Sequence, residues 1–125
     1  MIDIERQVAY WRSSAEEDLA VGRDLISRER TRHGLFFTHL ALEKALKAIV
    51  CCRTREVPPR VHNLVRLSEL AGISLTQVQL ETLAKMNAFN VEGRYPGSLQ
   101  PSPTPDAARA YLLLAEEVFS WLINQ

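Results

Sequence analysis

Residues 34–52 constrain the fold most, because apolar side chains cover most of a helical circumference there. A helix of this kind must contact neighbours on several sides, which makes it the central element of a bundle. Its polar side is a narrow stripe in which His39, Glu43 and Lys47 recur every fourth residue, with Lys44 alongside. Glutamate four residues before lysine is the favourable order for an ion pair, so we expect Glu43 to pair with Lys47. Charges on so apolar a helix are expected to face solvent, a cleft or a partner, and His39 to bond within the stripe or face a second copy.

Two more long helices are predicted, one on each side of this segment in the sequence. Apolar residues recur at steps of three or four from Ile4 to about Arg28. Three acids inside that stretch, residues 16–18, spread around the helix and are expected to form a solvated face. Thr104-Pro105-Asp106 combines a capping threonine, a proline at the first helical position and an acid in the first turn. It therefore predicts the start of a last helix, which runs to about Asn124.

The part of the chain between the long helices predicts short helices and loops. Pro58-Pro59 places a loop over 53–62, because proline cannot continue a helix. Asn63 is a candidate N-cap for a helix from Leu64 to Ala71 that ends at Gly72. Ser74 or Thr76 starts a further helix that reaches about Phe89. A long loop over 91–104, rich in proline and glycine, is of the length that is often functional.

No strand pattern occurs anywhere in the 125 residues. The predicted fold is all-α, an up-and-down bundle of three long helices plus one or two short ones, in a single domain over residues 1–125.

Composition excludes several classes of protein. With 46% apolar residues and zero net charge, the chain is neither a disordered tail nor a globally basic nucleic-acid binder. No apolar run approaches the roughly 18 residues of a membrane span, and the acidic start is no signal peptide. We therefore expect a cytoplasmic protein with no membrane partner. Cys51 and Cys52 are adjacent, which strains a disulfide, so both are expected as thiols without metal or cofactor.

Charge is unevenly spread along the chain. Residues 28–66 hold nine basic residues against three acidic ones, and the remainder is acidic by the same excess. This part of the molecule is a candidate anion-facing surface. The alternative is a solvated set of helix ends and loops.

Four stretches in this order resemble the prokaryotic HEPN domain family over about residues 8–123. They are Tyr10-Trp11 with residues 15–19, the run from Phe37 to Ala48, His62-Asn63-Leu64 with Leu67, and Asn87 with 89–97. The resemblance implies a helical bundle that is usually a homodimer. Many members accompany a minimal nucleotidyltransferase in a toxin–antitoxin-like module, and others are nucleotide-binding or non-catalytic partners.

A large branch of that family consists of metal-independent ribonucleases, in which an arginine is followed after four to six residues by a histidine. The matching arginine here is Arg94, but no histidine follows it at any distance. Ribose 2′-OH activation needs a base that titrates near neutral pH, and Tyr95 titrates near pH 10 when unperturbed. Three other spacings do match, Arg28–His33, Arg32–His39 and Arg55–His62, although they lie away from the family position.

For a nucleotide or RNA ligand, the expected contacts come from Arg94, Tyr95 and Asn90. Arginine offers a planar fork for phosphate, tyrosine a stacking face and asparagine an amide for a base edge. The expected supporting residues are Lys44, Lys47 and His62, with a helix cap or a contact under the Pro58-Pro59 loop as the alternative for His62.

Three functions remain open on the sequence. The first is a non-catalytic dimeric partner of a minimal nucleotidyltransferase that binds nucleotide or RNA. The second is a ribonuclease toxin whose site is rearranged and retains Arg94. The third is a helical interaction module without nucleotide binding. A homodimer is expected because large apolar side chains exceed what a bundle of this size readily hides: Tyr10, Trp11, Phe36, Phe37 and Trp121.

Overall fold

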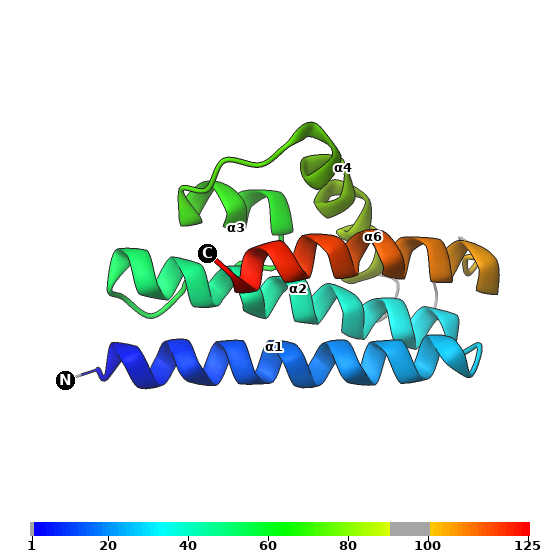
Figure 1. The fold of residues 1–125 in the computed structure, drawn as a ribbon, viewed down its shortest axis with the longest axis horizontal. Coiled ribbons are helices and arrows are strands. Elements are labelled where there is room, and N and C mark those ends of the chain that lie inside the picture. The colour runs from blue at the N-terminus through cyan, green and yellow to red at the C-terminus, as the bar shows by residue number, and fades with distance from the viewer. Residues whose placement is uncertain (1, 91–100) are drawn as a thin grey trace.

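Helices α1 (Ile4–Ser27) and α2 (Thr31–Thr54) form a long antiparallel pair (Figure 1). The computed structural model describes residues 2–90 and 101–125. The chain reverses between the two helices within Arg28–Arg30, where Glu29 takes a left-handed backbone conformation with φ of 62°. This pair is the frame on which the rest of the molecule packs.

The remaining helices cover α2 on its other sides. Helices α3 (Leu64–Ala71) and α4 (Gln77–Met86) are short and carry the chain back along the bundle. Helix α6 (Pro105–Ile123) then runs in the same direction as α2 and antiparallel to α1 (Figure 1). No strand occurs among the described residues, which hold three long helices and two short ones, so the predicted all-helical fold of three long helices plus one or two short ones is confirmed. None of these helices is both long enough and apolar enough for a membrane crossing.

Side-chain caps fix most of the predicted helix starts. The Asn63 side chain accepts from the Arg66 amide, and that of Thr104 accepts from the Ala107 amide. Thr76, rather than Ser74, starts α4 through a reciprocal capping box with Gln79. Gly72 ends α3 with φ of 67°, as its position in the sequence predicts.

Helix α2 begins three residues earlier than predicted, at Thr31. Gly34 lies inside the helix instead of opening it, because the missing side chain lets α1 approach closely. A Cβ at Gly34 would lie 3.0 Å from the Ile26 amide nitrogen and 3.1 Å from the Gly22 carbonyl oxygen. The glycine therefore serves the crossing of the two helices and not a helix end.

Helix α4 ends at Met86, before the predicted end near Phe89. Asn87 follows the helix, and its side-chain oxygen accepts from the Leu64 amide at 2.8 Å. The side-chain nitrogen of Asn87, Nδ2, donates to the side-chain oxygen of Asn63 at 3.3 Å. This asparagine joins the end of α4 to the start of α3. Of the long irregular segment predicted over 91–104, residues 101–104 are irregular as expected and 91–100 lie outside the described residues.

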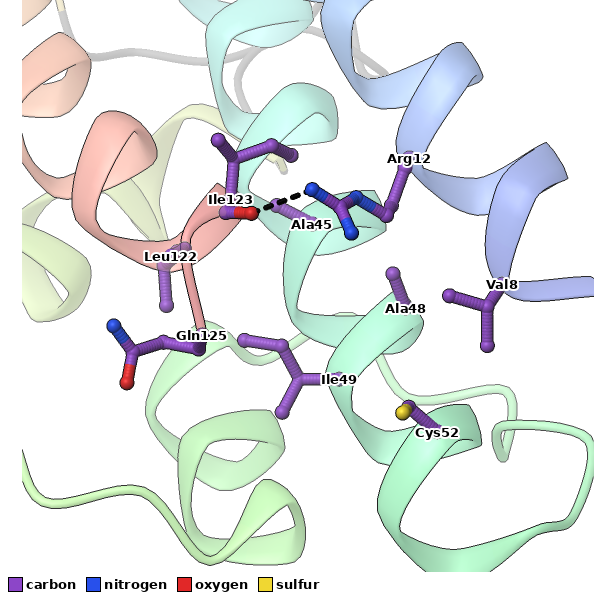
Figure 2. Close-up of a pocket in the computed structure, with 9 residues that line it drawn as sticks. All are labelled: Val8, Arg12, Ala45, Ala48, Ile49, Cys52, Leu122, Ile123 and Gln125. Atoms are coloured by element: carbon purple, nitrogen blue, oxygen red, sulfur yellow. Dashed lines mark hydrogen bonds between the residues drawn. The ribbon is translucent and has the colours of Figure 1, made fainter. Parts of the chain in front are cut away.

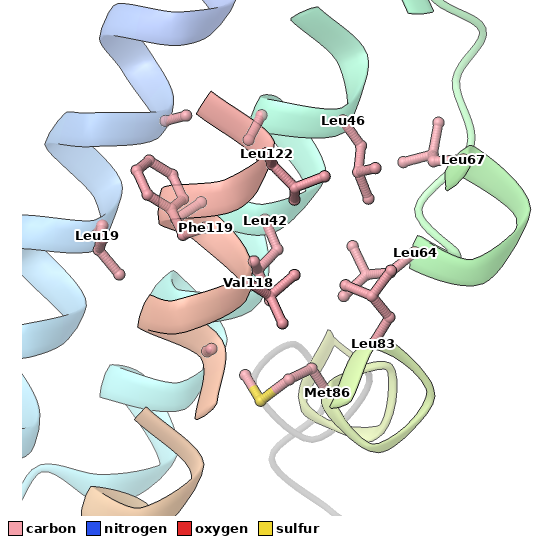
Figure 3. Packing of buried hydrophobic residues seen from close by; sticks show 14 of the residues in the cluster. Leu19, Leu42, Leu46, Leu64, Leu67, Leu83, Met86, Val118, Phe119 and Leu122 are labelled. Carbon is pink, nitrogen blue, oxygen red and sulfur yellow. The ribbon is translucent and has the colours of Figure 1, made fainter. Parts of the chain in front are cut away.

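The five helices of the described chain all contribute to one hydrophobic core (Figure 3). Helix α2 is the most buried of them, as predicted, and Leu35, Leu42 and Leu46 have no exposed surface. The labelled residues that meet around it are Leu19 from α1, Leu64 and Leu67 from α3, Leu83 and Met86 from α4, and Val118, Phe119 and Leu122 from α6. The polar stripe of α2 is thereby held in a fixed position.

Candidate functional site

The polar stripe of α2 is enclosed by the bundle. His39, Glu43 and Lys47 keep only 0%, 4% and 6% of their surface exposed. The expectation that these charges face solvent, a cleft or a partner is therefore wrong for Lys47. A buried ammonium group is costly unless an opposite charge lies beside it, so its environment must supply one.

Glu43 is the centre of the buried cluster. Its Oε2 accepts a hydrogen bond from Lys47 Nζ at 3.0 Å, which confirms the predicted ion pair. The same oxygen lies 3.0 Å from His62 Nδ1. The other oxygen, Oε1, lies 3.8 Å from His39 Nδ1. One carboxylate thus organises three side chains, and we call Glu43 with His39, Lys47 and His62 the Glu43 cluster.

His62 is the member of the Glu43 cluster that reaches solvent, with 46% of its side chain exposed. It does not cap α3, because Asn63 provides that cap. Its Nδ1 is engaged by the Glu43 carboxylate, which leaves Nε2 for another partner. A histidine whose ring is oriented by a carboxylate is equipped to accept or donate a proton at the other nitrogen.

Lys44 is paired on the other side of the stripe, with α1. Its Nζ lies 2.7 Å from Asp18 Oδ2 and 2.8 Å from the Ser14 hydroxyl. Asp18 is therefore not part of a solvated acidic face, because only 14% of its side chain is exposed. This acid neutralises Lys44, whose side chain keeps only 23% of its surface exposed.

Trp11, on α1, contacts the Lys47 end of the Glu43 cluster. The centre of its ring lies 5.5 Å from Lys47 Nζ, within the range of a cation–π contact. Tyr10 meets the Trp11 ring edge-on at 5.5 Å between ring centres and is 61% exposed. The buried indole nitrogen of Trp11 has no hydrogen-bond acceptor among the described residues.

Three of the predicted ligand-binding residues are thus placed at the polar stripe. Lys47 and His62 belong to the Glu43 cluster, whereas Lys44 pairs with Asp18 of α1. Asn90 is half-buried, and its backbone N–H donates to the backbone carbonyl oxygen of Asn87 at 3.4 Å. Arg94 and Tyr95 lie outside the described residues, so their predicted role in binding stays a prediction.

Sequence reasoning missed Glu43 as the organiser of the site, and Trp11 and Asp18 as its α1 partners. The available signal was the fourfold spacing of His39, Glu43 and Lys47. The contact from Glu43 to His62 joins positions in different elements, and no local pattern predicts it.

The three arginine–histidine spacings are separated by the fold in different ways. Arg32 Nε donates to the Ser102 hydroxyl, whereas His39 is fully buried. Arg55 pairs with Glu5 at 2.9 Å, whereas His62 belongs to the Glu43 cluster. Of the three arginine–histidine pairs, only Arg28 and His33 share a surface in the described part of the chain. They line one open hollow at the turn between α1 and α2.

A second cavity lies where the ends of α1, α2 and α6 meet (Figure 2). Arg12 crosses it and donates to the Ile123 carbonyl oxygen at 2.7 Å. Its volume of about 40 Å³ admits water, but a small-molecule site usually offers a few hundred Å³. This cavity is therefore too small for a nucleotide.

Three further ionisable side chains have shifted pKa values, Cys51, Glu5 and Arg55. Burial, and then the neighbouring Cys52, raise the pKa of the Cys51 thiol, whereas Cys52 is exposed. The hydrogen bond from Arg55 lowers the pKa of Glu5, and the same bond raises the pKa of Arg55. No group of three or more metal-ligating side chains within the described residues is arranged to hold an ion.

Two solved structures share this helical architecture. TT1696 from Thermus thermophilus superposes with a TM-score of 0.77 and 19% identity, over 93% of this chain and 95% of that protein. ST0689, described as an archaeal HEPN homologue, superposes with a TM-score of 0.74 and 22% identity, over 100% and 98%. No curated protein matches the sequence. The HEPN domain model matches residues 8–125, so the chain belongs to the HEPN domain family.

Proposed function

We propose that this HEPN protein is a non-catalytic partner of a minimal nucleotidyltransferase in a cytoplasmic toxin–antitoxin-like module, and that it binds nucleotide or RNA. One observation carries the non-catalytic part. Both lysines of the α2 stripe are neutralised inside the fold, Lys47 by Glu43 and Lys44 by Asp18. Cations whose charge is already compensated in this way are poorly placed to stabilise charge in a reaction.

The nucleotide or RNA contacts are assigned to Arg94, Tyr95 and Asn90 on their chemistry. His62 is the supporting residue that the geometry favours, because it is the exposed member of the Glu43 cluster. Lys44 and Lys47 act in this proposal by holding α1, α2 and the entry to α3 in place.

The partner is the most direct part of the proposal to test. A minimal nucleotidyltransferase encoded beside this gene, co-expressed and recovered as a stable complex with the chain, supports it. A neighbouring nucleotidyltransferase that elutes separately from this chain contradicts it.

A homodimer is proposed because α1 presents exposed apolar side chains. Tyr10 is 61% exposed and Val21 is 38% exposed, on a helix whose opposite side faces the core. We expect light scattering at tens of micromolar to give about twice the 14.2 kDa of the chain. Tyr10→Ser should shift the mass toward the monomer, whereas Val78→Ser, at an equally exposed position on α4, should not. A wild-type protein with the monomer mass at that concentration contradicts the dimer.

One observation favours a second candidate, a ribonuclease with a rearranged site. The buried Glu43 carboxylate orients the half-exposed ring of His62, which is the arrangement that a general base requires. In such an enzyme, His62 Nε2 would take the proton of the ribose 2′-OH as that oxygen attacks the phosphorus, and Arg94 would stabilise the charge on the phosphorane. The bond from phosphorus to the 5′-oxygen would then break, and the leaving 5′-oxygen would take a proton from water.

A single RNA experiment separates the two candidates. Short RNA is mixed with wild type, Arg94→Ala and His62→Gln at low salt, and both binding and cleavage are measured. The non-catalytic proposal expects binding without cleavage, and about tenfold or greater weakening in Arg94→Ala when a bidentate phosphate contact is lost. Cleavage by wild type that disappears in His62→Gln establishes the ribonuclease instead. Equal binding by wild type and Arg94→Ala removes Arg94 from the site.

A further inference from the structure

The turn between α1 and α2 places two arginines, Arg28 and Arg30, around an open hollow, with the acids Asp24 and Glu29 beside them. Its lining consists of Leu25 and Asp24 from α1, Arg28 and Arg30 from the turn, and His33 from the first turn of α2. The left-handed conformation of Glu29 lies between the two arginines. We call this feature the arginine hollow.

The cations of the arginine hollow are weakly paired within the described part of the chain. Arg30 forms no side-chain ion pair or hydrogen bond there, and it is exposed. Arg28 Nε lies 3.5 Å from Asp24 Oδ1, with 72% and 60% of the two side chains exposed. Such an exposed ion pair contributes little to stability in water, so an incoming anion can take the place of the Asp24 carboxylate beside Arg28 at low cost.

Five other arginines of the described chain are held more closely, each by an acid or a backbone carbonyl: Arg12, Arg23, Arg53, Arg55 and Arg109. Arg66 makes an exposed pair with Glu69 at 3.5 Å, like that of Arg28, and Arg6 and Arg60 have no ion-pair partner among the described residues. The arginine hollow therefore brings together two guanidinium groups that make at most one weak, exposed ion pair.

The start of α2 strengthens the positive field at the same place. Helices α1, α3, α4 and α6 begin with side-chain caps, whereas Arg30 gives α2 no side-chain cap. The first turn of α2 has no acid, and it carries Arg32 and His33. Cations at the positive end of a helix repel its dipole, whereas an anion bound there is favourable.

We propose that the arginine hollow binds phosphate groups, through the guanidinium forks of Arg28 and Arg30 with His33 in support. Paired guanidinium groups match the oxygens of a phosphate in geometry as well as in charge. No aromatic side chain other than the His33 ring lines the hollow among the described residues, so it would hold phosphate without reading a base. This proposal rests on the proposed function, which supplies a nucleotide or RNA as the source of the phosphate groups. It adds Arg28, Arg30 and His33 to the binding residues already proposed at positions 90, 94 and 95.

The test uses three probes on the full chain at low salt: short single-stranded RNA, ATP and inorganic tripolyphosphate. The hollow variant is Arg28→Ala/Arg30→Ala. The matched control is Arg6→Ala/Arg60→Ala, which removes two exposed arginines that form no side-chain ion pair with a described residue. Arg6 lies about 33 Å along α1 from Arg28 at about 1.5 Å per residue. Circular dichroism verifies that both variants are folded.

We expect the hollow variant to bind RNA and tripolyphosphate about tenfold more weakly, while the control changes either affinity by less than about threefold. The salt dependence of RNA binding should fall by about 0.7 in log–log slope for each phosphate contact removed from a single strand. ATP and tripolyphosphate that bind with equal affinity confirm that phosphate, and not the base, is recognised.

The outcomes separate the hollow from the proposed function. A hollow variant that binds both probes like wild type overturns the hollow, and if Arg94→Ala then weakens RNA binding, the proposed association stands. Tripolyphosphate that binds through the hollow without any RNA or ATP binding keeps the hollow and overturns the nucleotide or RNA association. Wild type that binds no probe overturns both.

Discussion

Glu43→Ala is expected to lower the free energy of unfolding by about 3–5 kcal/mol, because it leaves the Lys47 ammonium group buried without a counter-charge. Lys47 is 6% exposed, and the carboxylate that pairs with it is Glu43 at 3.0 Å. The same variant releases the His62 ring from its hydrogen bond to Glu43. Urea denaturation at neutral pH measures the change.

The matched control is Glu17→Ala, an exposed glutamate of α1 without a side-chain partner in the described chain. It should change the free energy of unfolding by no more than about 0.5 kcal/mol. If Glu43→Ala fails to fold, Glu43→Gln gives the readout, because the amide still accepts a hydrogen bond but leaves the lysine charge uncompensated. A loss below about 1 kcal/mol in either Glu43 variant contradicts the account of a buried charge that needs its partner.

Replacing both charges tests whether the pair itself stabilises the fold. Glu43→Leu/Lys47→Leu should recover much of the stability lost in Glu43→Ala, since a buried ion pair is often no more stabilising than apolar residues of similar volume. In the folded double variant His62 loses its carboxylate, so any RNA cleavage that depends on the oriented ring should disappear. The pair of measurements separates a structural role of Glu43 from a role in positioning His62.

The fold was largely predictable because its signals are local. The apolar circumference of α2, the capping threonine before Pro105 and the Asn63 cap each act within one or two turns of helix. The buried pairs were not predictable, because Lys44 meets Asp18 and Glu43 meets His62 across different elements. Helical periodicity places a residue on a face, but it does not specify which side chain approaches that face.

Gly34 illustrates the same limit at a helix boundary. A glycine near the start of an apolar run favours a helix end by its conformational freedom, and the sequence offers no sign of a crossing helix. Only the approach of α1 explains why the glycine lies inside α2. The candidate site is less predictable than the fold for this reason, since every contact of the Glu43 cluster beyond the α2 spacing depends on packing.

The crossing of α1 and α2 gives the second large expected effect. Gly34→Val should lower the free energy of unfolding by about 2–3 kcal/mol, toward the upper end of the usual cost of overpacking. Glycine is the poorer helix former, so propensity alone would make the variant more stable by a few tenths of a kcal/mol. Steric overlap outweighs that gain, because the new Cβ would overlap Ile26 Cγ1 and lie 3.0 Å from the Ile26 amide nitrogen. Backbone on the facing helix cannot move aside as a side-chain tip can.

Gly22→Ala probes the other side of the crossing, where a Cβ would lie 2.7 Å from Thr38 Oγ1 and 2.9 Å from the Gly34 carbonyl oxygen. Adding Thr38→Ala removes the hydroxyl but leaves the carbonyl, so a double-mutant cycle should show partial rescue. Ala110→Val is the control, because it places valine at an exposed position of α6 and should cost only about 0.6 kcal/mol of helix propensity. If Gly34→Val is no more destabilising than this control in urea denaturation, the helices separate more easily than the close approach of Gly22 and Gly34 implies. The expected difference instead identifies the crossing as the contact that sets the spacing of α1 and α2, and with it the position of Trp11 and Asp18 over the polar stripe.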